Sequence, residues 1–212
     1  METTFKDIRS KRNPKSRVKV MYGHFATPHS HVNTYIDVST VKCRHNNARE
    51  TARELVKDYA ETMVETILAL EGTEVIAAFM AEELSQNGIM NINNGSNISI
   101  IAPEFNQIRQ MILRDNTQRM VLGKQVLILA SSVTTGKTIR TAMNCVSYYG
   151  GRVCGVSSIF SSVDQVAGFP VHCIFSDKDI PGYEAYVNEE CPYCKQGVKI
   201  DALVNSFGYS KL

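Results

Sequence analysis

The residues best suited to chemistry lie in one stretch, 126–138, which reads V-L-I-L-A-S-S-V-T-T-G-K-T. Its first four residues, 126–129, are apolar, which is typical of a strand buried on both faces of a parallel sheet. The loop 130–137 then has small side chains, hydroxyls and one glycine, so its backbone N–H groups can approach an anion closely. A helix predicted to begin near Thr138 adds the positive end of its dipole. The stretch therefore predicts a phosphate site.

The end of this loop, Gly136-Lys137-Thr138, is also the end of a P-loop, the phosphate loop of nucleotide hydrolases. That pattern requires a glycine five residues before Gly136, and this chain has Ser131 there. The loop also lacks a metal ligand, because no carboxylate lies between residues 123 and 144. The sequence therefore favours a phosphate site without a resident metal over a nucleoside triphosphatase.

The loop also has plainer interpretations, and both stay open at the level of the sequence. The hydroxyls of Ser131, Ser132, Thr134 and Thr135 can simply cap the helix that follows, as hydroxyl residues at helix starts usually do. Lys137 on a first helical turn can be a solvated surface residue rather than a phosphate ligand.

Length and composition describe an ordinary globular chain. Its 212 residues suffice for one domain with additions, its hydrophobic share is 43% and its mean hydropathy is -0.16. No apolar run approaches the roughly 18 residues of a membrane helix, and the start has no signal-peptide apolar region. We therefore expect a cytoplasmic protein without a membrane partner.

The net charge of +2 gives no case for a nucleic-acid partner. Basic residues gather only near the start of the chain. We interpret this cluster as a solvated segment, which is the usual behaviour of charge runs. Its members are Lys11, Arg12, Lys15, Arg17 and Lys19.

Cysteine and histidine give weak signals for a metal. Cys191 and Cys194 have the C-x-x-C spacing of a zinc ligand pair, but a structural zinc usually takes four protein ligands and no second C-x-x-C or H-x-x-x-H pair is present. His24, His29 and His31 form a local cluster without cysteines or acids at ligand spacing. We therefore predict no metal site and a reduced turn at the cysteine pair.

The elements around the phosphate loop alternate between strands and helices. Strands are expected at 33–38, 66–70, 98–101, 126–129, 152–160 and 171–175, and helices at 46–60, 75–84 and 138–149. This order predicts an α/β fold, a doubly wound, mainly parallel sheet with helices on both faces. The polar turns 71–74 and 130–137 then meet at the carboxyl edge of the strands, where such sheets bind ligands.

One segment of the chain stays undecided between a helix and a flap. Residues 104–122 have no settled hydrophobic period. Their arginines, Arg109, Arg114 and Arg119, are expected on a solvated face, with anion contact as the alternative.

Four segments, in order along the chain, resemble the type I phosphoribosyltransferases, and within them the orotate branch. Residues 126–138 resemble the phosphoribosyl-diphosphate loop, and 190–198 (E-C-P-Y-C-K-Q-G-V) the C-P-x-C-x-x-G tail of many bacterial members. Residues 150–156 (G-G-R-V-C-G-V) are similar to a G-G-x-V-x-G-V strand start. Near the front, 23–25 (G-H-F), His31 and 34–37 (T-Y-I-D) resemble the hood segment that covers orotate.

This resemblance implies a single domain over 1–212, with an α/β core at 41–176 and a hood and tail at 1–40 and 177–212. It implies transfer of a phosphoribosyl group between phosphoribosyl diphosphate and a pyrimidine-like base, with magnesium carried by the substrate, in a homodimer. The pyrophosphate would face Gly72, Thr73 and Glu74, and the ribose would face Ala130 and Ser131. The 5-phosphate would lie on Ser132, Val133, Thr134, Thr135, Gly136, Lys137 and Thr138.

The chain departs from this family at several chemical positions. Ala130 and Ser131 replace two acids, residues 102–104 read A-P-E instead of R-K-E, and 105–122 contain neither lysine nor histidine. Loss of one preorganised electrostatic partner commonly costs about 10² to 10³ in rate. A second hypothesis is therefore a non-catalytic protein that binds a nucleoside monophosphate or phosphorylated sugar as a sensor or partner subunit. No residue is assigned a catalytic role.

Overall fold

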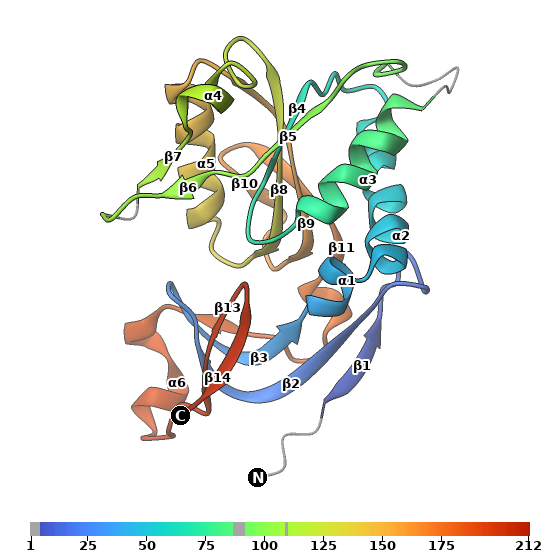
Figure 1. The fold of residues 1–212 in the computed structure, drawn as a ribbon. Coiled ribbons are helices and arrows are strands. Elements are labelled where there is room, and N and C mark those ends of the chain that lie inside the picture. Colours follow the sequence, from blue (N-terminus) through green and yellow to red (C-terminus); the bar gives the residue numbers. More distant parts are fainter. Residues whose placement is uncertain (1–4, 87–91, 109) are drawn as a thin grey trace.

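The computed structural model describes residues 5–86, 92–108 and 110–212 and has two main sheets (Figure 1). The core sheet has the strand order β10-β11-β9-β8-β4-β5, and its long strands run parallel. Its strands are β4 (Thr66–Ala69), β5 (Ser99–Ile101), β8 (Gln125–Val133), β9 (Arg152–Ser161), β10 (Gln165–Val166) and β11 (Phe169–Ser176). Only β10 is antiparallel to its neighbour, because it forms a hairpin with β11.

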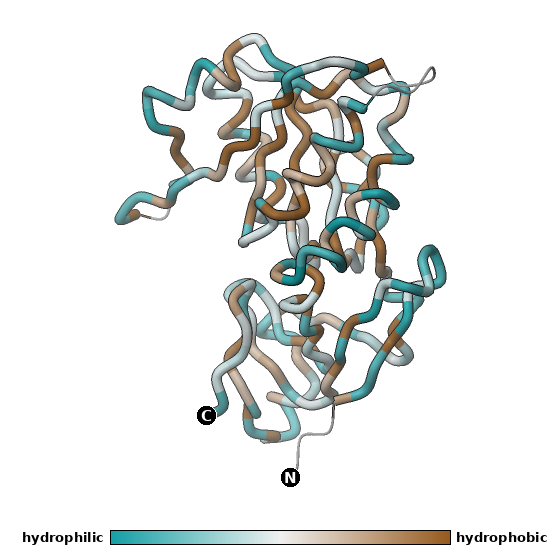
Figure 2. The backbone as a smooth tube through the Cα atoms, turned by 45° about the vertical axis from the view of Figure 1, so that its right-hand side comes forward, coloured by the Kyte–Doolittle hydropathy of each residue, from teal (hydrophilic) through white to brown (hydrophobic). Residues whose placement is uncertain are grey.

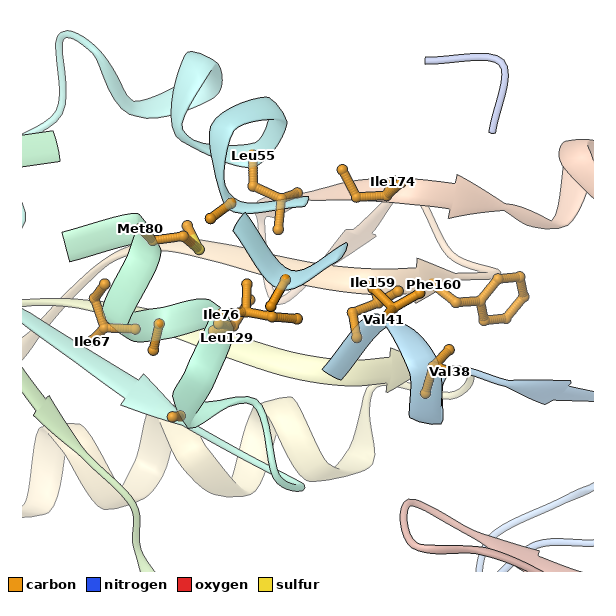
Figure 3. Close-up of a cluster of buried hydrophobic side chains, with 14 of the residues drawn as sticks. Val38, Val41, Leu55, Ile67, Ile76, Met80, Leu129, Ile159, Phe160 and Ile174 are labelled. Atoms are coloured by element: carbon orange, nitrogen blue, oxygen red, sulfur yellow. The ribbon is translucent and has the colours of Figure 1, made fainter. Parts of the chain in front are cut away.

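Helices cover both faces of this sheet because its strands are apolar on both sides. On β8, Leu127 and Leu129 belong to a buried cluster with α2 (His45–Leu55) and α3 (Glu74–Ser85), part of which Figure 3 shows. The alternate residue Ile128 packs with α5 (Lys137–Tyr148) on the other face. Apolar residues gather in these central strands in Figure 2. The predicted doubly wound α/β fold is confirmed.

The second sheet forms a hood, drawn below the core in Figure 1, to which both ends of the chain contribute. Its order is β12-β3-β2-β13-β14, with β1 also pairing with β2. The strands are β1 (Lys6–Arg9), β2 (Arg17–Ala26), β3 (His31–Asp37), β12 (Ala185–Tyr186), β13 (Ala202–Asn205) and β14 (Gly208–Lys211). Met21, Phe25 and Val32 pack with Val204 in a small core of their own.

The topology of the core explains where a ligand can bind. From β4 the chain passes to β5 on one side, and β8 then adds on the other side of β4. The strand order therefore reverses between β4 and β8, which is the switch point at which open α/β sheets bind ligands. The ends of these strands are held together, since the Leu70 N–H donates to the Leu129 carbonyl at 2.8 Å.

Strand β2 is the longest of the described elements that the sequence analysis did not predict. Its first residues alternate, with Val18 and Val20 buried between exposed basic residues. Met21 is then also buried, and the register with β3 shifts between Tyr22 and Phe25. A bulge of this kind breaks the period of two by which a strand is recognised.

The undecided segment 104–122 is neither one helix nor an unstructured flap in its described part. It forms a short hairpin from β6 (Glu104–Phe105) and β7 (Met111–Ile112), followed by α4 (Asp115–Gln118). The hairpin projects from the core in Figure 1. The remaining short helices are α1 (Ser39–Cys43), η1 (Val56–Tyr59), η2 (Asp177–Asp179), η3 (Asn188–Glu190) and α6 (Pro192–Lys195).

Arg12 corrects the interpretation of the basic cluster. Lys11, Lys15, Arg17 and Lys19 are exposed, as expected for a solvated segment. Arg12 instead is half-buried and pairs with Glu54 at 3.1 Å and Asp58 at 2.7 Å. It therefore joins the hood to the helical face of the core. No helix in the described ranges is long and apolar enough to cross a membrane.

Candidate functional site

A cavity of about 200 Å³ lies between the carboxyl edge of the core sheet and the hood. The core supplies Glu71, Phe160 and residues 131–139 to its wall. The hood supplies the β2–β3 turn at 27–30, residues of β3, Tyr183, and residues 204–206 at the end of β13 and just after it. The switch point of the sheet and the hood therefore enclose one site.

The helix predicted to begin near Thr138 begins at Lys137, and a left-handed glycine precedes it. Gly136 is the N-cap of α5 with φ of 72° and ψ of 6°, a left-handed conformation that costs other residues about 1–2 kcal/mol. A Cβ at this position would lie 2.7 Å from Cγ2 of Val166, so close packing also requires glycine. The alternative that hydroxyls cap α5 is wrong, because no side chain makes a capping hydrogen bond there.

All seven residues predicted to bind phosphate line this cavity. The first N–H groups of a helix have no intrahelical acceptor, so residues 137–139 present donors at the wall of the cavity. Thr134 and Thr138 are half-buried, and Lys137 is exposed at the rim. Val133 is buried and lines the site without a polar side chain. The structure therefore brings the predicted set together, and its binding of phosphate stays a prediction.

A carboxylate from another loop reaches Ser131, one of the two residues predicted to face a ribose. Ala130 is buried and does not line the cavity, whereas Ser131 is buried and does. Glu71 accepts hydrogen bonds through Oε2 from Oγ of Ser131 at 2.6 Å and from the N–H of Ser131 at 3.2 Å. The N–H of Ser132 lies 3.4 Å from the same oxygen. An acid from the end of β4 thus lies beside the positions that lack one.

The backbone of Glu71 is held in an unusual conformation. Its φ of 60° lies in the left-handed region, which glycine adopts far more easily. Nζ of Lys42 donates to the carbonyl of Glu71 at 2.9 Å and to that of Ser206 in the hood at 2.6 Å. Burial lowers the pKa of Lys42, against the opposing effect of Glu71 and other nearby groups. Such strain persists where the surroundings fix it, often at functional sites.

The residues predicted for the pyrophosphate side do not line this cavity. Gly72 and Glu74 are exposed on the turn before α3. Oγ1 of the buried Thr73 instead donates to the carbonyls of Leu70 at 2.8 Å and Leu129 at 3.2 Å. Glu71, one residue earlier, is the member of this turn that reaches the site.

In the described part of segment 104–122, no arginine lines the cavity. Arg114 pairs with Glu104 at 2.6 Å on an exposed surface. Arg119 is exposed and also absent from the cavity wall. Arg109 lies outside the described residues.

Two further hood residues, Tyr183 and Ser206, complete the wall, and no pattern in the sequence indicated them. Tyr183 packs edge-on against Phe160, with ring centroids 5.0 Å apart. Burial raises the pKa of Tyr183 to about 12, so its hydroxyl stays protonated near neutral pH. Ser206 lies between β13 and β14, near the end of the chain. Only the fold brings these distant segments together, and no local pattern indicates their role.

Histidines and cysteines of the hood meet outside this cavity. His24, His31, Cys191 and Cys194 have ligand atoms within 4.8 Å of one another. Spacing along the chain indicated no second ligand pair for the cysteines, but the fold brings two histidines to them. His29 instead is exposed on the turn at the cavity.

Comparison with known proteins agrees with this architecture. The chain is 36% identical over 78 residues to an orotate phosphoribosyltransferase of Thermoanaerobacter sp., a match over 37% of this chain and 40% of that protein. It is 25% identical over 179 residues to the orotate phosphoribosyltransferase of Caldanaerobacter subterraneus, covering 84% and 86% of the two chains. No protein-family profile matches the sequence.

Solved structures share the fold at low identity. The Mycobacterium tuberculosis orotate phosphoribosyltransferase in complex with 5-phospho-alpha-D-ribosyl 1-diphosphate superposes with a TM-score of 0.51 at 17% identity. The superposition covers 69% of this chain and 82% of that one. Sequence and structure together confirm the resemblance.

Proposed function

Because the chain has the fold of the type I phosphoribosyltransferases, we propose that it transfers a phosphoribosyl group between phosphoribosyl diphosphate and a pyrimidine-like base. One observation carries this proposal. The loop 132–138 lies at the switch point of the sheet, and the hood covers it to form a cavity with donors on one side and a carboxylate beside them.

The 5-phosphate is assigned to residues 132–138. The helix N-terminus of α5 offers backbone N–H groups and its dipole, and Thr134, Thr135 and Thr138 add hydroxyl donors. Lys137 and His29 are the cationic or titratable basic side chains among the described wall residues. Lys137 begins α5 and therefore suits an anion held by the first turn.

The ribose hydroxyls are assigned to Glu71. Its Oε2 already accepts the Ser131 hydroxyl, while a carboxylate has two oxygens and about four acceptor sites. The second oxygen can therefore accept from a ribose hydroxyl while the first keeps the loop in place. Breaking the anomeric bond develops positive charge on the ribose, which a nearby carboxylate stabilises.

Magnesium enters this account as part of the substrate, bound to phosphoribosyl diphosphate. Mg²⁺ prefers oxygen ligands and commonly keeps several waters, so one or two carboxylates with substrate phosphates suffice. Glu71 is the carboxylate among the described residues of the cavity wall. Following the resemblance, we also propose a homodimer in the cytoplasm.

A second function has its own supporting observation. The two positions after the apolar run of β8 hold Ala130 and Ser131, which are both buried. Because their side chains are uncharged, neither can supply a negative charge to a ribose. Arg114 and Arg119, two of the arginines considered for anion contact, are absent from the described cavity wall. A non-catalytic protein that binds a nucleoside monophosphate as a sensor fits this loss of charge.

Two assays on the full chain separate the functions. Release of pyrophosphate from phosphoribosyl diphosphate with a panel of pyrimidine-like bases, or the reverse reaction from nucleoside monophosphates, supports transfer. Calorimetry with the same ligands, with and without magnesium, measures binding. Magnesium-independent binding of a monophosphate without turnover favours the sensor, and absence of binding by every phosphate refutes both.

A further inference from the structure

Four potential metal ligands converge in the hood, away from the phosphate cavity. His24 lies on β2, His31 begins β3, and Cys191 and Cys194 flank the start of the short helix α6. Cys191 is fully buried and His24 is 1% exposed. The fold therefore places two nitrogen and two sulfur ligands around one point, from segments more than 160 residues apart in sequence.

The distances between the donor atoms fit one small ion. Nε2 of His24 lies 3.0 Å from Nδ1 of His31, 3.4 Å from Sγ of Cys191 and 3.6 Å from Sγ of Cys194. Sγ of Cys194 lies 3.2 Å from Nδ1 of His31. Zinc bonds of about 2.0–2.3 Å at tetrahedral angles separate the donors by about 3.3–3.8 Å. Small shifts convert this cluster into a tetrahedral Cys₂His₂ set.

The hydrogen bond and ring contacts of His24 orient its Nε2 atom toward the two cysteines. Nδ1 of His24 lies 3.0 Å from the carbonyl of Val198, which can only accept, so Nδ1 carries the proton. The lone pair of Nε2 then faces the cysteines, as in zinc sites whose histidines donate to a carbonyl. The ring also stacks on Tyr193 with centroids 5.3 Å apart. These contacts fix the ring before an ion binds.

The backbone of His24 is fixed as well. Its N–H donates to Oδ2 of Asp201 at 2.8 Å, and its carbonyl accepts from the N–H of Asp201 at 2.8 Å. A Cβ at Gly23 would lie 2.6 Å from the same carboxylate oxygen, so this approach requires glycine. The segment that carries His24 is therefore held against the start of β13.

We propose that His24, His31, Cys191 and Cys194 bind one structural zinc ion. Two thiolates and two imidazoles are a common closed zinc set, with no position left for water or substrate. Softness of the sulfur ligands disfavours magnesium and calcium. The ion links the C-terminal tail to both strands of the β2–β3 hairpin.

The site also bears on the phosphate cavity, although it does not depend on the proposed function. His24 and His31 flank the turn 27–30, whose residues line that cavity. Zinc at the base of this hairpin fixes the turn above the phosphate loop. Removal of zinc is therefore expected to weaken phosphate binding indirectly, through movement of the hood.

The direct test measures metal in the purified full chain by mass spectrometry after expression in zinc-supplemented medium. The expected result is close to one zinc per chain. The double variant Cys191→Ser/Cys194→Ser should lose nearly all of it. Two matched variants, His29→Asn on the same hairpin and Cys43→Ser on α1, should keep it, because neither side chain belongs to the cluster.

Cobalt provides a test that does not depend on the folding of a variant. Zinc is removed from the wild-type chain with a chelator and replaced by Co²⁺, whose absorption reports its ligands. A thiolate-to-cobalt charge-transfer band with intense tetrahedral ligand-field bands is expected. A folded wild-type chain with neither zinc nor cobalt uptake, or with a disulfide between Cys191 and Cys194, overturns the proposal.

Discussion

The carboxylate of Glu71, in the turn after β4, accepts a hydrogen bond at 2.6 Å from the hydroxyl of Ser131, near the end of the neighbouring strand β8. This contact brings negative charge to a position where the phosphate loop itself has none. It depends on a left-handed backbone at Glu71 and on the Lys42 ammonium that holds the Glu71 carbonyl. Under the proposed function, the loop after β4 supplies the carboxylate that Ala130 and Ser131 do not.

The substitution Glu71→Gln tests whether the charge of this carboxylate contributes to the reaction. The amide keeps the shape and can still accept through its oxygen, but it lacks the charge that stabilises a developing cation. We expect kcat/KM for phosphoribosyl transfer to fall about 10²-fold, with affinity for inorganic phosphate unchanged. The matched variant Glu74→Gln, exposed on the same turn, should behave as wild type. Equal effects of the two variants would contradict the assignment.

The substitution Gly136→Ala should lower the free energy of unfolding by more than the cost of the left-handed backbone alone. The left-handed φ costs about 1–2 kcal/mol, and contact of the new Cβ with Val166 adds about 1–3 kcal/mol. Gly182 has a similar φ of 71° but open space around it, so Gly182→Ala isolates the backbone cost. Urea unfolding measures both variants. Similar losses for the two alanines would show that Val166 does not restrict the loop.

Replacing Lys137→Met should weaken phosphate binding without unfolding the chain. A hydrogen bond to a charged group contributes about 1.5–3 kcal/mol, which corresponds to a roughly tenfold to hundredfold change in affinity. The distant exposed Lys211→Met serves as the control for overall charge. Calorimetry with a nucleoside monophosphate at two salt concentrations measures the effect. If both variants bind equally well, Lys137 is only a solvated residue.

The stability that the Arg12–Glu54 contact between hood and core contributes should depend on pH. Burial raises the pKa of Glu54, but hydrogen bonds from Lys57 and Arg12 outweigh burial and hold this pKa below its ordinary value of 4.5. A lowered folded-state pKa gives stability that is present above the unfolded-state value and is lost as pH falls through the folded one. The free energy of unfolding should therefore decline below about pH 4.5.

Arg12→Met isolates this contribution. We expect the variant to lose about 2 kcal/mol at pH 7, because it removes hydrogen bonds to two partly buried carboxylates. Its stability should also decline less steeply in acid than that of the wild type. Lys15→Met, whose exposed ammonium lies 3.9 Å from Glu50, should change stability by at most about 0.5 kcal/mol. Parallel acid unfolding curves for Arg12→Met and wild type would refute the assignment.

Local patterns in the sequence were sufficient for the α/β core. The apolar run of β8 and the helical spacing of apolar residues in α2 and α3 follow from which of their side chains are buried. The sequence therefore predicted these three elements to within a few residues. Strand β2 was missed because its bulge hides the alternation. The seven residues predicted to bind phosphate line one cavity together because they are contiguous, and their binding of phosphate stays a prediction.

The rest of the site depends on contacts between distant segments. The order of elements predicted that turns 71–74 and 130–137 lie at one edge of the sheet, but not that β4 and β8 are neighbours. The left-handed backbone of Glu71 does not follow from a glutamate in the sequence either. The meeting of His24 with Cys191 joins residues 167 positions apart. Motif spacing along the sequence cannot predict a ligand pair whose members are so far apart.

We propose that residues 132–138 hold the 5-phosphate and Glu71 the ribose of one ligand. A crystal structure of the full chain with phosphoribosyl diphosphate and magnesium would show both contacts at once. We expect the 5-phosphate within hydrogen-bonding distance of the first N–H groups of α5, and a ribose hydroxyl on the Glu71 carboxylate. A phosphate bound elsewhere, or a ribose facing away from Glu71, would contradict it.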